Sequence, residues 1–305
     1  MNTSTLMTML APAIRRVPGA VTLVRKMAKM AHYVLPEWII VLDYPVYAKQ
    51  RWTLERPHYL LNEMLERQRA QFERRLASFL ELAPGFTQIV AAANERKDPG
   101  APYWNNPWFP TLDAIAIYGF IAANRPRLYL EVGSGHSTRF ARQAIKDRSP
   151  ETEILSIDPC PRDEINAICD EVIRSPVEEV DLEIFDRLEP GDILFIDNSH
   201  RVLMNSDATM LFLDVLPRLK PGVLVQIHDI CLPYDYPETW SRRYYSEQYV
   251  LAAYLLAKES RFRILLPNYF ISKDAALRGI LGRLWKEGRM PDVPHHGCSI
   301  WLESQ

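Results

Sequence analysis

The stretch LYLEVGSGHST, residues 128–138, carries the clearest structural signal in the chain. Its first half is a short, mostly apolar run that is typical of a buried strand, and its second half is a glycine-rich turn that opens a helix. Gly133 and Gly135 let the backbone approach a ligand closely at the end of the strand. Asp158 follows 23 residues after Gly135, where an acid suits hydrogen bonding to ribose hydroxyls. The stretch therefore predicts a nucleotide-type site at the edge of a sheet.

Strands and helices alternate along the chain around this stretch. Predicted strands cover 127–132, 153–158, 171–174, 192–197, 222–227, 263–272 and 298–303. Predicted helices cover 111–123, 137–148, 162–169, 202–218 and 242–258. Short, largely apolar strands that alternate with helices indicate a parallel sheet with helices on both faces. The expected fold class is therefore α/β, with a Rossmann-like sheet.

The sequence pattern before this alternation is different, and two domains are therefore expected. Residues 1–100 are expected to form a mostly helical N-terminal extension that caps the site or mediates assembly, including a homo-oligomer. Within it, residues 59–83 have apolar side chains at three- and four-residue spacing, which predicts one long amphipathic helix. The segment 94–110 is rich in Pro and Asn and marks the boundary with the α/β domain, which covers 101–305.

Composition and charge narrow the class of protein. A chain of 305 residues with 48% hydrophobic content is long enough for a large domain with an extension. The net charge of −2 gives no general argument for nucleic acid as a partner. No apolar run approaches the roughly 18 residues of a membrane span. Four cysteines without a C-x-x-C pair favour a reduced, cytoplasmic protein.

The beginning of the chain is basic. Residues 1–36 contain no Asp or Glu, and they carry Arg15, Arg16, Arg25, Lys26 and Lys29 among apolar residues. Two interpretations remain open. Residues 13–31 form a helix that lies on an anionic membrane surface, as a peripheral contact, or they form a basic helix that packs on the rest of the protein.

The ligand of the glycine-rich turn can be inferred from two of its residues. The dinucleotide fingerprint G-x-G-x-x-G requires a third glycine, and Thr138 occupies that position. Glu131, at the start of the turn, suits a cationic ligand better than a pyrophosphate. S-adenosylmethionine has a sulfonium, an ammonium and a ribose, and it therefore matches both acids of the pattern. The predicted cofactor-binding residues are Glu131, Gly133, Ser134, Gly135, Ser137, Asp158 and Asp197.

Four motifs together resemble a known family. LYLEVGSGHST, SIDP, LFIDNSH and IHDICLPYDYP are similar to motifs of the class I S-adenosylmethionine-dependent methyltransferases, and more narrowly of the bacterial group labelled methyltransferase domain 24. The resemblance covers roughly residues 101–305. It implies a seven-stranded sheet in the order 3-2-1-4-5-7-6, in which CSIWLE, residues 298–303, is the antiparallel last strand.

Two successive strands end in acidic and imidazole residues. Asp197 and His200 follow the strand at 192–196, and His228 and Asp229 follow the next one. Ligands of open α/β sheets bind outside the carboxyl ends of the strands, so these four side chains are expected to converge beside the methyl donor. Asp and His are ligands of divalent cations, and a bound cation can lower the pKa of a substrate hydroxyl.

This second pattern is similar to that of metal-dependent O-methyltransferases, including catechol O-methyltransferase and the macrolide-sugar enzymes. By position, the resemblance implies that Asp197, His228 and Asp229 bind metal and that His200 is the catalytic base. His228 departs from the family, whose members have an oxygen donor there. The expected metal is Mg, Mn or Fe, and the imidazole makes Mg less secure and Mn, Fe or Zn more open. The alternative is that Asp197 contacts only the cofactor and that His228 is a core histidine.

The sequence thus predicts an S-adenosylmethionine-dependent methyltransferase. The expected reaction is metal-assisted O-methylation of a hydroxyl on a small polar molecule, such as a sugar or a natural product. Two other classes stay open. Thr138 counts against an NAD-dependent oxidoreductase, and the intact glycine turn counts against a non-catalytic S-adenosylmethionine-binding protein.

Overall fold

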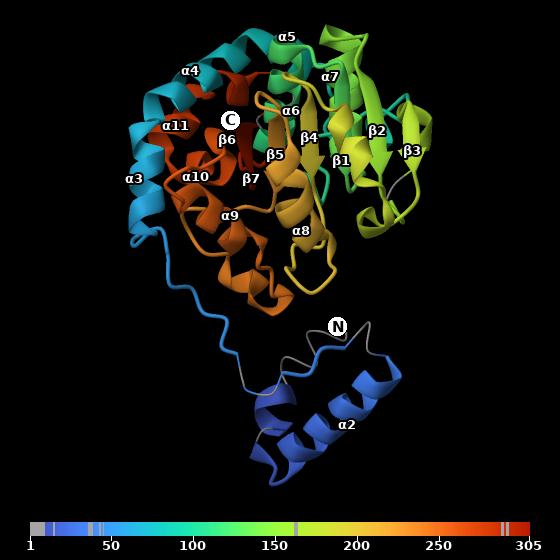
Figure 1. Ribbon diagram of the computed structural model, residues 1–305. Helices are drawn as coiled ribbons and strands as arrows, with labels where there is room; N and C mark the ends of the chain where they lie inside the picture. The colour runs from blue at the N-terminus through green and yellow to red at the C-terminus, as the bar shows by residue number, and fades with distance from the viewer. Residues whose placement is uncertain are drawn as a thin grey trace. The chain divides into compact units, whose positions relative to one another are not determined.

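The computed structural model describes residues 10–14, 16–35, 39–42, 44, 46–161, 164–287, 290 and 293–305. The chain divides into two compact units, Met1–Ala48 and Lys49–Gln305. The smaller unit contains helix α2 (Ala20–Val34), drawn in blue in Figure 1. No helix among the described residues is both long and apolar enough to cross a membrane.

The larger unit is built on one seven-stranded sheet in the order β3-β2-β1-β4-β5-β7-β6, which can be followed in Figure 1. Its strands are β1 (Leu128–Val132), β2 (Glu153–Ile157), β3 (Glu171–Ile173), β4 (Ile193–Ile196), β5 (Leu224–His228), β6 (Phe262–Pro267) and β7 (Ser299–Ser304). Strands β1 to β5 pair in parallel, and β7 pairs antiparallel with β5 and with β6. The predicted order and the antiparallel last strand are confirmed.

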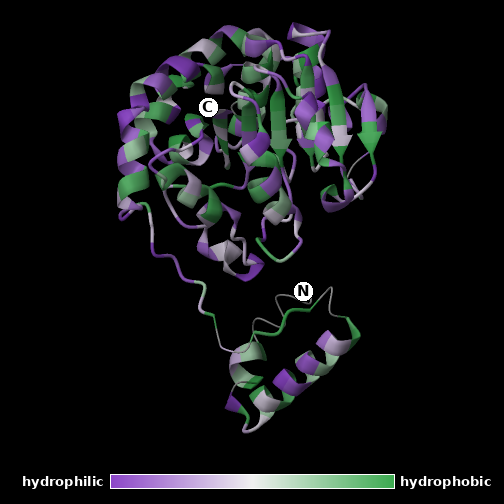
Figure 2. Ribbon diagram, in the orientation of Figure 1, coloured by the Kyte–Doolittle hydropathy of each residue, from purple (hydrophilic) through white to green (hydrophobic). Residues whose placement is uncertain are grey.

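Both faces of the sheet are covered. Every residue of β1, β4 and β5 is buried, which is typical of parallel strands that lie between two layers of helices. Figure 2 shows these strands largely in the green of hydrophobic residues. The helices of the α/β alternation are α6 (Thr111–Asn124), α7 (His136–Arg148), α8 (Asp207–Met210) and α9 (Glu247–Leu256).

Residues 49–100 belong to the same compact unit as the sheet, so the structure places its division at residue 48 rather than at the predicted residue 100. Helices α3 (Tyr59–Arg67), α4 (Arg69–Phe79) and α5 (Ala83–Phe86) lie in this segment, and Gln68 separates the first two, so the predicted single helix over 59–83 is wrong. Their apolar side chains join the core of the sheet, and they include Leu61, Leu65, Phe72, Leu76 and Phe79.

Three other predicted elements differ from the structure. The predicted strand 263–272 ends at Pro267, and the chain continues as α10 (Asn268–Lys273) and α11 (Ala275–Ile280). The prediction is wrong there because a short apolar run suits a buried helix as well as a strand. The predicted helix 202–218 begins only after the N-cap Ser206. The predicted helix 162–169 is reduced to a turn at Asn166–Ile168, and residues 162 and 163 lie outside the described residues.

Candidate active site

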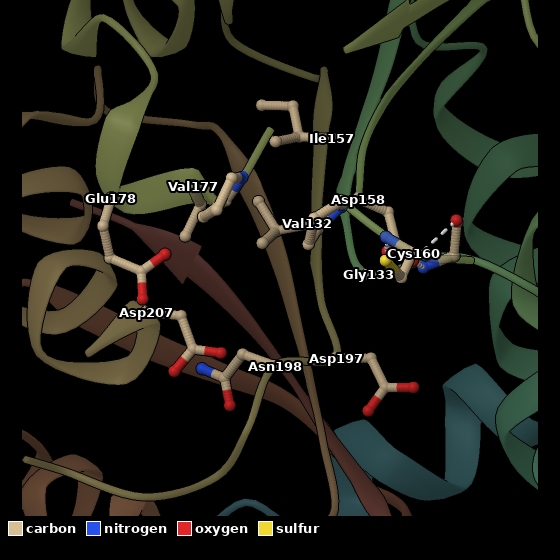
Figure 3. A pocket seen from close by; sticks show the side chains of 13 residues that line it. Val132, Gly133, Ile157, Asp158, Cys160, Val177, Glu178, Asp197, Asn198 and Asp207 are labelled. Carbon is tan, nitrogen blue, oxygen red and sulfur yellow. Dashed lines mark hydrogen bonds between the residues drawn. The ribbon is translucent and has the colours of Figure 1, made fainter. Parts of the chain in front are cut away.

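A cavity of about 310 Å³ lies at the carboxyl ends of β1, β2 and β4. Figure 3 shows Glu178, Asp207 and Asn198 on one side of it and Asp158 on the other. Apolar side chains, among them Val132, Ile157 and Val177, form part of the wall. The lining contains four carboxylates, from Asp158, Glu178, Asp197 and Asp207, and no Lys, Arg or His among the described residues that form it. The cavity is therefore strongly acidic.

Gly133 brings the turn after β1 against the end of β4. Its φ is +83°, and a Cβ at this position would lie 1.9 Å from the backbone oxygen of Asp197. Any other residue here would collide with the neighbouring strand end as well as strain the backbone. The glycine is thus required by the packing of the two strand ends that form the cavity.

Asp158 holds the glycine-rich turn in place. Its Oδ2 accepts hydrogen bonds from the backbone N–H and the hydroxyl of Ser134, at 2.8 and 2.9 Å, and its Oδ1 accepts one from the N–H of Cys160 at 2.9 Å. The carboxylate therefore has a fixed position on the wall of the cavity. This is the position in which the sequence predicts a ribose contact.

Glu131 lies beneath the turn and is fully buried. The hydroxyl of Thr138 donates to both of its oxygens, at 2.8 and 3.0 Å, and also accepts the backbone N–H of Gly135 at 3.0 Å. Burial raises the pKa of Glu131 to about 8, against the opposing effect of the Thr138 hydrogen bond. Thr138 stands where a dinucleotide fingerprint has its third glycine, and its role here is to tie the turn to this acid.

A second cavity of about 260 Å³ adjoins the first. Tyr103, Trp108 and Phe109 contribute aromatic side chains to it, and the beginning of α7 contributes Gly135, His136 and Ser137. Ser134 and Asp197 line both cavities. Every predicted cofactor residue except the buried Glu131 therefore lines one cavity or the other.

The four residues predicted from the ends of β4 and β5 do come together. The Nε2 atom of His200 lies 3.2 Å from Oδ1 of Asp197 and 3.5 Å from Oδ2 of Asp229. The Nδ1 atom of His228 lies 3.5 Å from Oδ1 of Asp197 and 3.4 Å from Oδ1 of Asp229. Asp197 therefore joins this cluster to the acidic cavity.

Two further acids complete the cluster, and sequence reasoning missed both. Glu247, in the first turn of α9, is fully buried, and its Oε1 lies 2.5 Å from Nδ1 of His200. Asp113 of α6 lies 3.7 Å from Nε2 of His228. Its carboxylate accepts hydrogen bonds from Asn268, Ser299 and the N–H of Cys298, at 2.6 to 2.8 Å. Asp113 was a usable signal, because it is the lone acid in the otherwise apolar run 111–123. Glu247 was not, because acids are common in the first turn of a helix and the residues around it are polar and aromatic.

The cluster perturbs the pKa values of its members. Burial alone lowers the pKa of His200, but the charge of Glu247 and the hydrogen bond with Asp197 outweigh it, so the pKa lies well above 6.5. The pKa of His228 is raised to about 9, because Asp197 and Asp229 outweigh the same effect of burial. Burial raises the pKa of Asp197, yet the two imidazoles bring it well below its usual range. The imidazole nitrogens and carboxylate oxygens of the cluster thus lie within ion-pair distance of one another.

Backbone conformation supports a special role for this region. His200 has a φ of 61° and Asp229 has a φ of 53°, both in the left-handed region that residues other than glycine rarely adopt. Such conformations cost of order 1 kcal/mol or more and concentrate at functional sites. The strain lies at the two residues whose side chains face each other across the strand ends.

Aromatic rings contact the two histidines of the cluster, and the segment 50–58 contacts the loop after β5. The ring of Tyr245 lies 4.5 Å from that of His200, and Phe109 stacks on His228 at 5.4 Å. The segment 50–58, which we call the strap, is bonded to the loop after β5: Asp235 accepts the N–H of Trp52 at 3.0 Å, and its own N–H donates to the oxygen of Trp52 at 2.9 Å. These contacts fix the loop that follows Asp229.

The predicted metal ligands converge, but they do not form a recognisable metal centre. Within the described ranges, no group of three or more His, Cys, Asp or Glu side chains is arranged to hold a metal ion. Neither ring nitrogen of His228 makes a hydrogen bond, although carboxylate oxygens surround it at 3.4 to 3.7 Å. As arranged, imidazole groups and carboxylates pair with one another.

Residues 130–230 match the family model described as a methyltransferase domain, which confirms the resemblance seen in the sequence motifs. An uncharacterised protein of Archaeoglobus fulgidus is 38% identical over 100 residues, which are 30% of this chain and 44% of that protein. The match thus spans less than half the length of that relative.

Solved structures of two O-methyltransferases are distantly similar. TomG from Streptomyces achromogenes, in complex with S-adenosylmethionine, is 16% identical, covering 50% of this chain and 71% of that chain with a TM-score of 0.35. The enzyme from Bacillus cereus, in complex with S-adenosylhomocysteine, is 17% identical. The match covers 63% of this chain and 82% of that chain, with a TM-score of 0.34. At these values the similarity carries no argument about the reaction, which must be inferred from the family match and from the geometry of the site.

Proposed function

We propose that this protein is an S-adenosylmethionine-dependent methyltransferase that methylates a hydroxyl of a small polar molecule, such as a sugar or a natural product. The observation that carries the proposal is the acidic lining of the cavity at the ends of β1, β2 and β4. The sulfonium and ammonium groups of S-adenosylmethionine are attracted to such a lining. The pyrophosphate of a dinucleotide would be repelled by it, which counts against an NAD-dependent oxidoreductase.

The two adjoining cavities suit the two halves of the donor. In this arrangement the adenosyl group occupies the larger cavity, with its ribose on Asp158 and its adenine against the apolar wall of Ile157 and Val177. The amino-acid half occupies the second cavity, where the N-terminus of α7 favours a carboxylate. The sulfonium then lies beside Asp197, which lines both cavities.

The cluster beyond Asp197 supports transfer to oxygen. A hydroxyl must lose its proton as it attacks the methyl group, and His200 is the proposed base. Glu247 holds Nδ1 of this imidazole, so that Nε2 faces the strand ends. An imidazole accepts a proton only when it is neutral, whereas the acids around His200 raise its pKa. The mechanism therefore requires the donor's positive charge beside Asp197 to lower the pKa of His200 when the donor is bound.

The proposal also includes a divalent cation that assists the reaction. The chemistry of Asp197, His228 and Asp229 suits Mn or Fe better than Mg, because one donor is an imidazole nitrogen. A divalent cation bound there would lower the pKa of the acceptor hydroxyl. In the structure, however, the side chains of Asp197, His228 and Asp229 contact one another. The proton transfer is therefore assigned to His200, without a metal. Turnover after exhaustive chelation, with metal content measured in parallel, tests this part.

Calorimetric titration with S-adenosylhomocysteine tests the assignment of the donor cavity. Asp158→Asn keeps the size of the side chain but removes the charge that is proposed to hold the ribose, so binding should weaken by at least about ten-fold. Asp214→Asn, an exposed acid on the helix after α8, is the matched control and should bind like the wild type. Equal affinity of the wild type and both variants would show that the donor binds elsewhere.

A further inference from the structure

Helix α2 has two faces of opposite chemistry. Leu23, Met27, Met30 and Val34 recur at spacings of four, three and four residues and form one apolar stripe. Arg25 and Lys29 project from the opposite side of the helix, and Lys26 lies at the edge of the stripe. Figure 2 shows the resulting alternation of green and purple along α2. This pattern is that of a helix at a boundary between an apolar and a polar medium.

The apolar stripe is exposed. No residue of α2 is buried, and the exposed fraction is 60% for Leu23, 60% for Met27, 69% for Met30 and 76% for Val34. A contiguous exposed apolar surface of this kind marks an interaction site. The stripe therefore requires a partner that is apolar where it meets these four side chains.

The charge of the helix identifies that partner. Residues 1–36 contain no Asp or Glu, and α2 has no acid in its first turn. Arg25 and Lys29 stand four residues apart and repel each other, with no acid on the helix to relieve them. An anionic lipid surface supplies both an apolar layer for the stripe and negative charge for the cations.

We propose that α2 lies in the interface of an anionic membrane, with Leu23, Met27, Met30 and Val34 inserted among the acyl chains and Arg25, Lys26 and Lys29 at the headgroups. Arg16 adds a further basic residue shortly before the helix, and Arg15 lies outside the described residues. The helix connects through residues 35–49 to the strap, which is bonded to the loop after β5. Membrane binding would thus tether the active-site loop to the bilayer by a short stretch of chain.

Vesicle flotation with the full-length protein tests the proposal. Wild-type protein should float with vesicles of phosphatidylcholine and phosphatidylglycerol and much less with vesicles of phosphatidylcholine alone. Met27→Glu, at the centre of the stripe, should weaken binding roughly ten-fold or more, because a buried Met side chain is replaced by an anion. Met204→Glu is the matched control, since Met204 is 98% exposed in the larger unit, and it should float like the wild type.

The cationic face has a separate prediction. Lys26→Gln combined with Lys29→Gln should weaken binding to the anionic vesicles by roughly five-fold for each lysine and leave the weak binding to neutral vesicles unchanged. Two measurements without lipid identify other partners of the stripe. Light scattering detects an oligomer, and thermal unfolding detects packing of the stripe on the larger unit.

Three results would overturn the proposal. The first is wild-type protein that does not float with anionic vesicles. The second is a Met27→Glu variant that dissociates an oligomer in the absence of lipid, which would make the partner a second copy of this chain. The third is a Met27→Glu variant that lowers the melting temperature of the catalytic unit relative to Met204→Glu, which would place the stripe on that unit.

Discussion

His200 lies between carboxylates that reach it from three different elements. Asp197 follows β4, Asp229 follows β5 and Glu247 begins α9. The backbone at His200 lies in the left-handed region, and the contact with Glu247 fixes which ring nitrogen faces the strand ends. A residue placed in this way has a stronger claim to a chemical role than its sequence motif alone provides.

Replacing His200 by Ala should lower turnover by about 10²–10⁴-fold, the usual contribution of general-base catalysis. Binding of S-adenosylhomocysteine should be unchanged, because this side chain does not line the donor cavity. His296→Ala, at an exposed position, is the matched control and should keep full turnover. Steady-state kinetics and calorimetry on the same preparations separate the two effects. An unimpaired His200→Ala variant would leave positioning alone to explain the reaction.

The contact between α4 and α6 ties the segment 49–100 to the sheet. Gly119 of α6 faces Phe79 of α4, and a Cβ at Gly119 would lie 2.2 Å from Cε1 of that ring. Both residues belong to a tightly packed interior, where an added methyl group forces side chains or backbone to move. The absence of a side chain at Gly119 thus allows the two helices to approach.

Gly119→Ala should therefore lower the free energy of unfolding by about 1–3 kcal/mol, as overpacking does in other cores. Gly279→Ala in α11 is the matched control. A Cβ there meets no atom within 4 Å, and Ala favours a helix over Gly by roughly 1 kcal/mol, so this variant should be as stable as the wild type or more so. Urea unfolding of the three proteins measures both effects. A stable Gly119→Ala variant would contradict the packing of α4 on α6.

Elements with a strong local pattern could be predicted from the sequence, and others could not. The glycine turn and the polar ends of β4 and β5 were found because ligands of open α/β sheets bind where such residues follow a buried strand. Residues 268–272 are predicted as the end of a strand but belong to α10, since an apolar run of that length fits a strand and a buried helix equally. Glu247 lies far along the chain from His200 and reaches it only through the docking of α9, which no local pattern reveals.

The chain combines a unit that carries the candidate active site with a separate unit that contains the amphipathic helix α2. Each has its own chemistry. The strand ends of the larger unit gather acids, whereas residues 1–36 carry only basic charges. The acids at the strand ends line the cavity that we propose for the methyl donor.

Thermal unfolding of the wild-type protein with S-adenosylmethionine or with NAD distinguishes the cofactor that we propose for the acidic cavity from a dinucleotide. A ligand that binds only the folded state at roughly 100 times its Kd stabilises that state by about 2.7 kcal/mol. S-adenosylmethionine should raise the melting temperature in a concentration-dependent way, and NAD should leave it unchanged. A rise with NAD and none with S-adenosylmethionine would show that the cavity holds a dinucleotide instead.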